Sequence, residues 1–472
     1  MSITIPFDNT YANLPEGFFA KALPTPVKTP NLIAFNADLA KLLGINVSDL
    51  NGAADVFSGN QIAENAAPIA QLYAGHQFGS FNPQLGDGRA HLLGEVVGSD
   101  GVRRDIQLKG SGQTPFSRAG DGRAWMGPVL REYVISEAMH ALGIPTTRAL
   151  AAVSTGETIY RDGAMPGAIL TRVASSHLRV GTFQVFAHRG LIDQLKTLTD
   201  YAIARHHPDA DGPMGLLRAV CQKQADLIAA WMSVGFIHGV MNTDNCTISG
   251  ETIDYGPCAF MDAYHEARVY SSIDQMGRYA FGNQPRVIVW NMAQFATALI
   301  QQCDDKEAAV EEATEIVHAM PGQIEAAWLA RFGRKIGLAQ ATDADQTLIE
   351  DLLALMQQDG ADFTNTFNAL SGEAPSAQFL DQDRFAAWSA QWNARLAEEV
   401  DPLAVMRGAN PQIIPRNHQI EKMIAAAVAA DMVPFERLQE ALAQPFDVSA
   451  EFADLQRPPT DDEIVPATFC GT

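Results

Sequence analysis

The sequence has few cysteines, no long apolar run and no excess of positive charge, and each shortage argues against a class of protein. Its cysteines form no C-x-x-C pair, which suits a reducing compartment better than a disulfide-stapled secreted domain. No apolar run approaches the roughly 18 residues that a membrane helix needs. The start, MSITIPFDNTYANLPEGFF, lacks the basic region and apolar core of a signal peptide. We therefore expect a cytoplasmic protein with no membrane partner.

Acidic residues outnumber basic residues by 55 to 33, which gives a formal net charge of −22. Such a balance repels nucleic-acid phosphates and anionic lipids, so we expect no nucleic-acid partner. Residues 84–131 depart from it, with seven Lys or Arg and five Asp or Glu. This locally basic window is where a small anionic ligand is expected to bind.

The 472 residues, of which 47% are hydrophobic, suffice for one large two-lobed unit or for two or three ordinary domains. Alternation of apolar and polar residues predicts strands, and helical spacing of apolar residues predicts helices. The predicted strands cover residues 91–97, 104–109, 149–153 and 168–173. The predicted helices cover residues 32–43, 129–142, 216–234 and 287–302, with further amphipathic helices beyond residue 304.

This order of elements indicates an α+β fold that divides near residue 174. A smaller β-rich N-lobe would span residues 1–174, and a larger helical C-lobe would span residues 175–472. The C-lobe ends in the acidic segment RPPTDDEIVPATFCGT, whose composition predicts mobility. We expect the protein to be a monomer.

The segment HGVMNTDN (238–245), followed by DYG (254–256), places metal-seeking oxygens beside a candidate base. Protein kinases carry H-R-D-x-x-x-x-N and then D-F-G, in which the Asn and the second Asp hold magnesium and the first Asp is the base. Here the pattern is in register, but Val240 stands at the base position. Asn245 and Asp254 are thus candidate magnesium ligands. The alternative is that both stabilise ordinary turns.

A second kinase-like feature is a lysine that ends a predicted strand, followed by a glutamate in the next predicted helix. Lys109 and Glu132 match the pair that aims an ammonium group at phosphate oxygens in kinases. A Lys and a Glu in this order are also common by chance. Their place upstream of residues 238–245 is what strengthens the prediction.

Two copies of G-D-G-R, at residues 86–89 and 120–123, offer glycines for close backbone approach and an arginine for phosphate contacts. Neither is a Walker A loop or a dinucleotide fingerprint, and isolated copies would more often be plain loops. Arg172 and Arg179 flank the predicted lobe junction. There they would either contact phosphate in a cleft or form surface salt bridges.

Together these segments closely resemble the selenoprotein O family, also known as the YdiU family in bacteria. The resemblance covers essentially the whole chain, and several long motifs in one order are far more specific than a lone glycine signature. The segments that carry it are YAGHQFGSFNPQLGDGRA, QLKGSGQTPFSRAGDGRA, REYVISEAM, HGVMNTDNCTISGETIDYGP, GRYAFGNQPRVIVWNM and NPQIIPRNH.

The resemblance implies a protein-kinase-like, two-lobed fold that binds ATP in reversed orientation and transfers AMP, rather than phosphate, to protein hydroxyls. The implied partners are ATP and protein substrates modified on Ser, Thr or Tyr, with UTP as a further candidate nucleotide. Attack at the α-phosphorus would release pyrophosphate.

The resemblance also assigns roles to individual residues. It implies that Asp244 is the general base, so the Val240 position is no defect. It implies that Asn245 and Asp254 hold Mg²⁺ or Mn²⁺. Glu132 would orient Lys109. The implied nucleotide contacts are Gly86, Gly88, Arg89, Lys109, Asp121, Gly122, Arg172 and Arg179.

Some members of this family carry selenocysteine near the C-terminus, where this chain has Cys470 in the sequence Phe-Cys-Gly-Thr. Cys470 is therefore a candidate redox residue, and Cys258 is a candidate partner thiol. The alternative for Cys258 is the commoner role of a small buried apolar residue.

Two other functions stay open. One is an ordinary kinase-type phosphotransferase. The other is a catalytically silent, pseudokinase-like scaffold that binds nucleotide, for which the missing H-R-D aspartate is the best support. The retained base, metal and phosphate groups argue against the scaffold, because a scaffold has no obvious need for the whole set.

Overall fold

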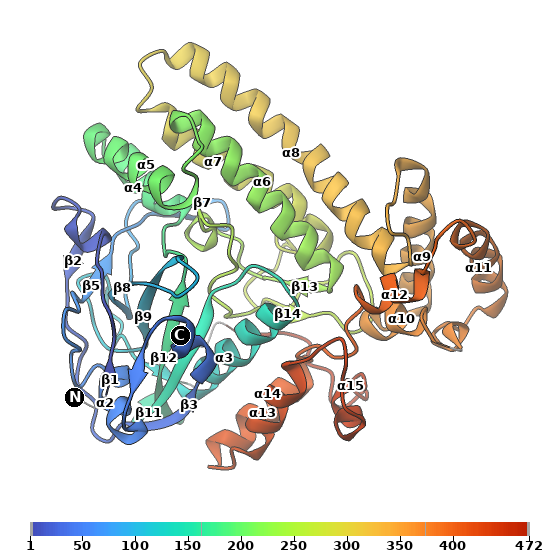
Figure 1. Cartoon of the computed structure of the whole chain (residues 1–472), viewed down its shortest axis with the longest axis horizontal. Helices are drawn as coiled ribbons and strands as arrows, with labels where there is room; N and C mark the ends of the chain where they lie inside the picture. The colour runs from blue at the N-terminus through green and yellow to red at the C-terminus, as the bar shows by residue number, and fades with distance from the viewer. Residues whose placement is uncertain (1–2, 162, 373, 470–472) are drawn as a thin grey trace.

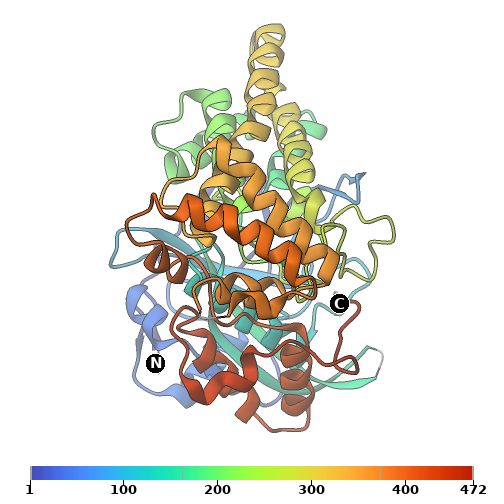
Figure 2. The same cartoon turned by 90° about the vertical axis from the view of Figure 1, so that its right-hand side faces the viewer.

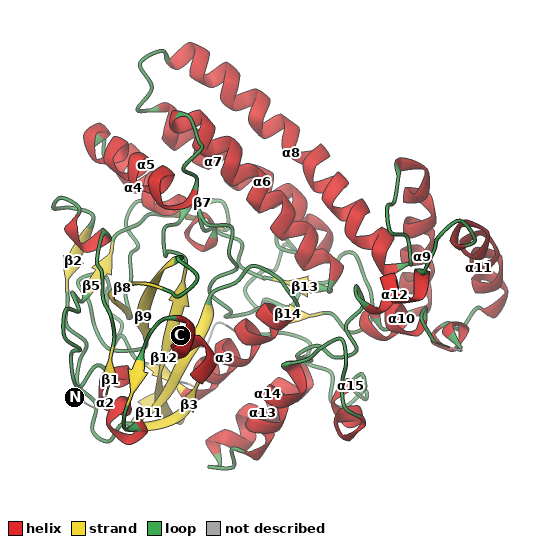
Figure 3. Cartoon of the chain, in the orientation of Figure 1, coloured by secondary structure: helices red, strands yellow, loops and turns green. Residues whose placement is uncertain are grey.

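An eight-stranded antiparallel sheet forms the β-rich part of the computed structural model, which describes residues 3–161, 163–372 and 374–469. The strands follow the order β2-β5-β8-β9-β12-β11-β3, with β10 beside β12. Figure 3 shows them gathered on one side, with long helices on the other, so the α+β class is confirmed. Their bounds are β2 Phe19–Lys21, β3 Asn31–Phe35, β5 Ile69–Gln71, β8 Ala90–Val97, β9 Arg103–Lys109, β10 Ala124–Trp125, β11 Arg148–Tyr160 and β12 Ala164–Ala174.

The four predicted strands are confirmed as β8, β9, β11 and β12, which lie next to one another in this sheet. Within β9, Gln107 and Lys109 share one face because side chains alternate along a strand. Arg172 of β12 stands directly opposite Gln107. The register therefore places Lys109 and Arg172 on the same face of the sheet.

The predicted helix over residues 32–43 is wrong in its first half. Residues 31–35 form β3, which pairs with β11, and only Ala37–Leu42 form a helix, α1. Asn36 separates them, because its side chain accepts a hydrogen bond from the Leu39 backbone and caps α1. Pairing with a distant strand overrode the helical spacing of the apolar residues.

One helix, α3 (Met126–Ala141), packs beside the sheet and confirms the helix predicted over residues 129–142. It is buried along most of its length. The late helices α13 (Asn417–Val428) and α14 (Val433–Leu442) return across the molecule to pack on it (Figure 1). The Tyr133 and Phe435 ring centres are 5.8 Å apart.

The helical part begins after β12 ends at Ala174, near the predicted division of the chain. Helices α6 and α7 confirm the two predicted long helices, and α8 packs along both, as Figures 1 and 2 show. A kinase-like pair of lobes stays a prediction. The helix bounds are α4 Val180–His188, α5 Ile192–His206, α6 Gly212–Ser233, α7 Gln284–Ile300, α8 Lys306–Lys335, α9 Gln346–Asp359, α10 Phe363–Ala369, α11 Gln382–Leu396, α12 Pro402–Arg407 and α15 Ala453–Gln456.

Several short elements complete the described chain. The hairpin β6–β7 and the pair β13–β14 lie close to the site described below. The remaining bounds are β1 Ile3–Thr4, β4 Asn46–Val47, α2 Leu50–Ser58, β6 Gly75–Gln77, β7 Ser80–Asn82, β13 Phe236–Ile237 and β14 Ala259–Phe260. Across the described residues, no helix is both long enough and apolar enough to traverse a bilayer.

The acidic tail is attached to the rest of the protein at Thr468. The Thr468 backbone N–H donates to the Tyr270 carbonyl (2.7 Å), and the Ser272 N–H donates to the Thr468 carbonyl (3.0 Å). The Thr468 hydroxyl also donates to the Pro257 carbonyl (2.5 Å). Mobility of the tail stays a prediction, and Cys470 lies outside the described residues.

Candidate functional site

A cavity of about 650 Å³ lies between the sheet and the 238–257 segment, a volume suited to a nucleotide. Its lining includes seven Lys or Arg and four Asp, a local positive excess in a protein of net charge −22. This charge favours a polyphosphate ligand. The predicted site residues among its walls are Gly86, Gly88, Arg89, Lys109, Asp121, Gly122, Arg172, Arg179, Asp244, Asn245 and Asp254.

His238 ties the two halves of the kinase-like motif together. Its ring is fully buried, and Nε2 lies 2.8 Å from the Ile253 carbonyl, one residue before Asp254. Its backbone N–H donates to Gln284 Oε1 (3.1 Å). Burial lowers the pKa of the ring. His238 therefore acts as an anchor that sets the 238–245 segment against Asp254.

Asp254 is the central anion of the site. Its Oδ1 accepts from Lys109 Nζ (2.7 Å) and from Arg172 Nη2 (2.6 Å), and its Oδ2 accepts from Arg179 Nη1 (3.0 Å). Burial raises the pKa of this carboxyl, but the three cations outweigh burial and hold the pKa well below its usual value. Asp254 is therefore ionised.

Glu132 of α3 contacts two of these basic side chains, those of Lys109 and Arg172. Its Oε2 accepts from Lys109 Nζ (2.6 Å), and its Oε1 accepts from Arg172 Nε (2.8 Å) and Nη2 (2.6 Å). Burial raises the pKa of Glu132, but Arg172 and Lys109 together lower it below its usual value. The structure thus brings the predicted Lys109–Glu132 pair into direct contact.

Arg172 and Arg179 are both buried, so the alternative of surface salt bridges is excluded. Besides Asp254, Arg179 Nη1 donates to the Asp244 carbonyl (2.8 Å). Its guanidinium carbon lies 4.5 Å from the ring centre of Tyr73. Arg179 therefore links the two aspartates of the motif.

Asp244 is buried and only lightly hydrogen-bonded. Its Oδ2 accepts from Gln77 Nε2 (3.2 Å), and its Oδ1 has no hydrogen-bond partner among the described residues. Burial raises the pKa of this carboxyl to about 6, against the opposing effect of Arg179. A buried carboxylate with spare acceptor capacity is chemically suited to accept a proton.

The oxygen donors of this site suit a magnesium-like ion. Asn245 Nδ2 donates to the Val240 carbonyl (2.9 Å), which leaves the amide oxygen as the available donor. Within the described chain, no group of three or more His, Cys, Asp or Glu side chains is placed to hold a metal. Mg²⁺ does not require one, because it binds one or two carboxylates together with substrate phosphates and waters. Asn245 and Asp254 therefore fit such an ion.

The first G-D-G-R turn is closely packed around its glycines. Gly86 has φ +100°, and a Cβ there would lie 2.6 Å from the Phe116 ring. A Cβ on Gly88 would lie 3.0 Å from the Phe116 carbonyl. Arg89 is at the cavity wall. These glycines thus let the loop around residue 116, which also lines the cavity, pack closely against the turn.

The second G-D-G-R turn is held by its own side chains. Asp121 accepts from Arg161 (2.9 Å and 3.0 Å), which lowers the pKa of Asp121. Gly122 has φ +69°, and a Cβ there would meet the Gly112 backbone at 2.2 Å. Arg123 donates to two backbone carbonyls near residue 25. These contacts hold the turn in a defined conformation in the wall of the cavity.

Sequence reasoning missed Asp87, the aspartate inside the first G-D-G-R turn. Asp87 is buried, accepts from Gln107 Nε2 (3.0 Å) and lies 3.7 Å from Arg179 Nη2. Burial raises the pKa of Asp87. The only available signal was its position between two glycines of a phosphate-type turn.

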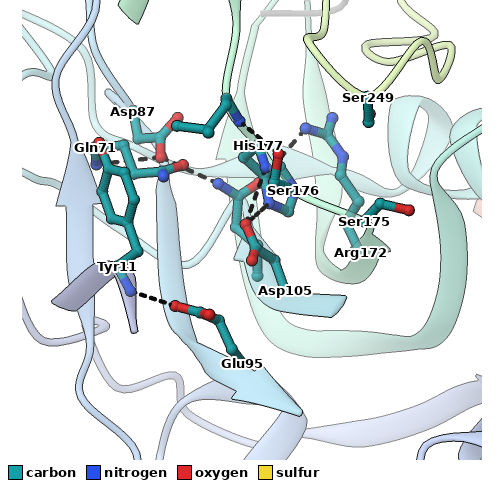
Figure 4. A network of polar contacts seen from close by, with 12 residues as sticks. Tyr11, Gln71, Asp87, Glu95, Asp105, Arg172, Ser175, Ser176, His177 and Ser249 are labelled. Carbon is teal, nitrogen blue, oxygen red and sulfur yellow. Dashed lines mark hydrogen bonds and ion pairs between the residues drawn. The ribbon is translucent and has the colours of Figure 1, made fainter. Parts of the chain in front are cut away.

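A buried polar network beside the cavity connects the sheet to the helical part (Figure 4). Asp105 of β9 contacts His177 Nδ1 (3.0 Å) and accepts from Arg205 of α5 (2.5 Å). Arg205 also contacts Glu95 of β8 (3.2 Å). This network fixes β8 and β9 of the sheet relative to α5.

Cys258 lies behind the site and outside the cavity lining. Its side chain is fully buried, and burial raises the pKa of the thiol to about 11. Such a thiol has little thiolate character at neutral pH. The position favours the alternative of a small buried apolar residue.

The whole chain is similar to proteins of one family. The family model described as protein adenylyltransferase SelO matches residues 2–443. Curated relatives named protein nucleotidyltransferase YdiU are 68% identical in Roseobacter denitrificans and 65% identical in Ruegeria pomeroyi. Both comparisons run over 472 residues and cover the whole of each chain.

The cavity and the matches together define an enzyme of the nucleotidyltransferase class. Within that class, the chain belongs to the SelO/YdiU family, since the family model and the relatives cover nearly all or all of it. The family predicted from the sequence segments is thereby confirmed.

Proposed function

We propose that this enzyme transfers AMP from ATP to the hydroxyl groups of Ser, Thr or Tyr side chains in proteins. The observation that carries the proposal is the buried carboxylate of Asp244, which lies beside Asn245 and Asp254 in a cavity with a basic excess. The names of the family and of its relatives support nucleotidyl transfer to protein.

In the proposed reaction, the acceptor hydroxyl oxygen forms a bond to the α-phosphorus of ATP. The bond from that phosphorus to the bridging oxygen breaks, and pyrophosphate leaves with the electron pair. The hydroxyl proton passes to the carboxylate of Asp244. A protein phosphodiester of AMP and free pyrophosphate result.

The basic residues of the cavity stabilise the charge that grows on pyrophosphate. Lys109 and Arg172 are pre-aligned by Glu132, so their positions need little adjustment when phosphate arrives. Arg89 and Arg179 also line the cavity and add positive charge to it. A bound Mg²⁺ or Mn²⁺ at Asn245 and Asp254 would supply further charge neutralisation at the phosphates.

A protein-kinase-like, two-lobed arrangement is part of this proposal. Its support is the Lys109–Glu132 contact together with the order of His238, Asn245 and Asp254 along the chain. Val240, at the kinase base position, is a buried apolar residue, which disfavours kinase chemistry there. UTP is included as a second candidate nucleotide.

The test is incubation of the full chain with a cell extract, Mg²⁺ or Mn²⁺, and ATP labelled on either the α- or the γ-phosphate. We expect stable protein labelling from the α-label alone, with AMP found on Ser, Thr or Tyr by mass spectrometry. Labelling from γ and none from α would reject AMP transfer in favour of a phosphotransferase. Measurable binding of ATP with no labelling by ATP or UTP would favour the scaffold.

A further inference from the structure

The hairpin β6–β7 lies against the 242–244 segment, outside the main sheet. Three successive hairpin residues each contact one of three successive residues of this segment. The contacts are His76 N–H to Thr243 Oγ1 (2.7 Å), Gln77 Nε2 to Asp244 Oδ2 (3.2 Å) and Phe78 N–H to Asn242 Oδ1 (3.2 Å). These three hydrogen bonds to the hairpin therefore help to fix the conformation of residues 242–244.

The other side of the Asp244 carboxylate faces the first residue of the hairpin. A Cβ on Gly75 would lie 2.5 Å from Asp244 Oδ1 and 2.9 Å from its Cγ. Only a residue without a side chain leaves this space to the carboxylate. Gln77 thus holds one oxygen by a hydrogen bond, while the Gly75 backbone closely confines the other.

The hairpin itself is firmly supported by the helical part. Gln184 of α4 bridges to it, since Gln184 Nε2 lies 2.9 Å from His76 Nδ1 and Gln184 Oε1 accepts from the Thr243 hydroxyl (2.7 Å). At the turn, the centres of the Phe78 and Tyr279 rings are 5.1 Å apart. The amide of Gln77 therefore projects from a fixed backbone.

We propose that Gln77 is a positioning residue for the transfer reaction, whose side-chain amide holds the Asp244 carboxylate against rotation about its Cβ–Cγ bond. This inference rests on the proposed function, in which Asp244 accepts the hydroxyl proton. The hydrogen bond keeps the carboxylate aligned with the acceptor, so its loss affects the chemical step and leaves nucleotide binding intact. A misplacement of about 1 Å at a reacting group costs up to about 100-fold in rate.

The test is Gln77→Met, which keeps the length of the side chain and removes the donor. We expect kcat for AMP transfer from α-labelled ATP to fall about tenfold, with KM for ATP within twofold of wild type. Gln222→Met is the matched control. Gln222 Nε2 also donates to an aspartate, Asp226 Oδ1 (3.1 Å), but on the exposed surface of α6, so this variant should match wild type.

Gln77→Glu is the second variant, for use where Gln77→Met does not fold. It is similar in shape and places a repelling carboxylate beside Asp244, so kcat should again fall with KM unchanged. Unchanged kcat in a folded variant, or parallel loss of ATP binding and kcat, overturns the positioning role alone. Absence of AMP transfer by wild type overturns the proposed function and this inference together.

Discussion

The partly buried Lys109 and the fully buried Lys335 show how differently two regions of this molecule accommodate positive charge. In the cavity, Lys109 lies 2.6 Å from Glu132 and 2.7 Å from Asp254. In the helical region beyond residue 304, Lys335 donates to Asn410 Oδ1 (2.9 Å) and lies 4.3 Å from the ring centre of Phe367. Within the described chain, no carboxylate lies within 4.0 Å of the Lys335 ammonium group.

The two lysines differ in what surrounds their charge. The charge of Lys109 lies at the cavity, where a ligand could bind, whereas the charge of Lys335 lies in the core, where it lowers the stability of the fold. Lys109 is held by the same two carboxylates that hold Arg172, and this cluster of opposite charges faces the cavity. Burial lowers the pKa of Lys335 to about 7, because an amide oxygen and aromatic rings replace water poorly. Removing charge should therefore cost activity in the first region and increase stability in the second.

The largest expected effect is that of Asp254→Ala. This variant removes the common partner of three cations and one proposed metal ligand, so AMP transfer should fall by about 10³-fold or more. Labelling with α-labelled ATP measures it. The control is Asp226→Ala, at an exposed position of α6, which should keep full activity. Substantial transfer by the Asp254 variant would remove this residue from the proposed mechanism.

Next in size is Asp244→Asn, which keeps the shape of the side chain and removes its basicity. We expect kcat to drop about 10²- to 10⁴-fold, because general-base catalysis contributes about that much. The ATP dissociation constant, measured by calorimetry, should change little. A kcat within tenfold of wild type would contradict the assignment of the base.

Lys335→Met should act in the opposite direction and raise stability at pH 7 by about 2 kcal/mol. A lowered pKa of several units opposes folding by about 1.4 kcal/mol per unit, offset by the lost Asn410 hydrogen bond and ring contacts. Urea unfolding measures the difference, and AMP transfer should be unchanged. A less stable variant would show that the polar contacts of Lys335 outweigh its burial.

The same substitution carries a pH signature. The pKa of Lys335 is about 7 in the fold and about 10.4 in the unfolded chain, so the unfolded state binds more protons between these values. The free energy of unfolding of wild type therefore rises at this site as the pH increases from about 7 to 10. Below about pH 7 it does not change with pH at this site. The advantage of the variant should be largest at pH 7 or below and shrink toward pH 10.

The smallest effect is expected for Cys258→Ala. The thiol is buried behind the cavity and has a raised pKa, so transfer rates should stay within twofold under reducing and oxidising conditions alike. Stability should fall by about 1 kcal/mol, from lost packing. A rate that responds to oxidation in wild type and not in this variant would restore a redox role for Cys258.

Much of the site could be predicted because its signals are local. Lys109 at a strand end, Glu132 in the next helix, and the spacing of Asn245 and Asp254 follow from chain order. The family resemblance added Asp244. Arg172 and Arg179 are both buried and both contact Asp254. This arrangement depends on the register of the sheet and on where α4 begins, and no local sequence pattern predicts either.

The missed residues share a different physical cause. Gln77 reaches Asp244 and Asp87 reaches Arg179 because residues 75–87 pack against segments more than 80 positions away. Likewise, the strand over residues 31–35 was hidden because its partner in β11 is more than 100 positions away. Contacts between such distant segments are determined by the whole fold, and the residues near each position in the sequence do not predict them.

The three cations on Asp254 imply that the free enzyme carries its own substitute for a phosphate group. In the proposed reaction, an arriving nucleotide would exchange partners with this internal anion, so Lys109, Arg172 and Arg179 would not have to lose water at that moment. Binding then resembles ion exchange. Its heat should be small, and its affinity should depend on salt less steeply than the basic residues of the cavity would suggest.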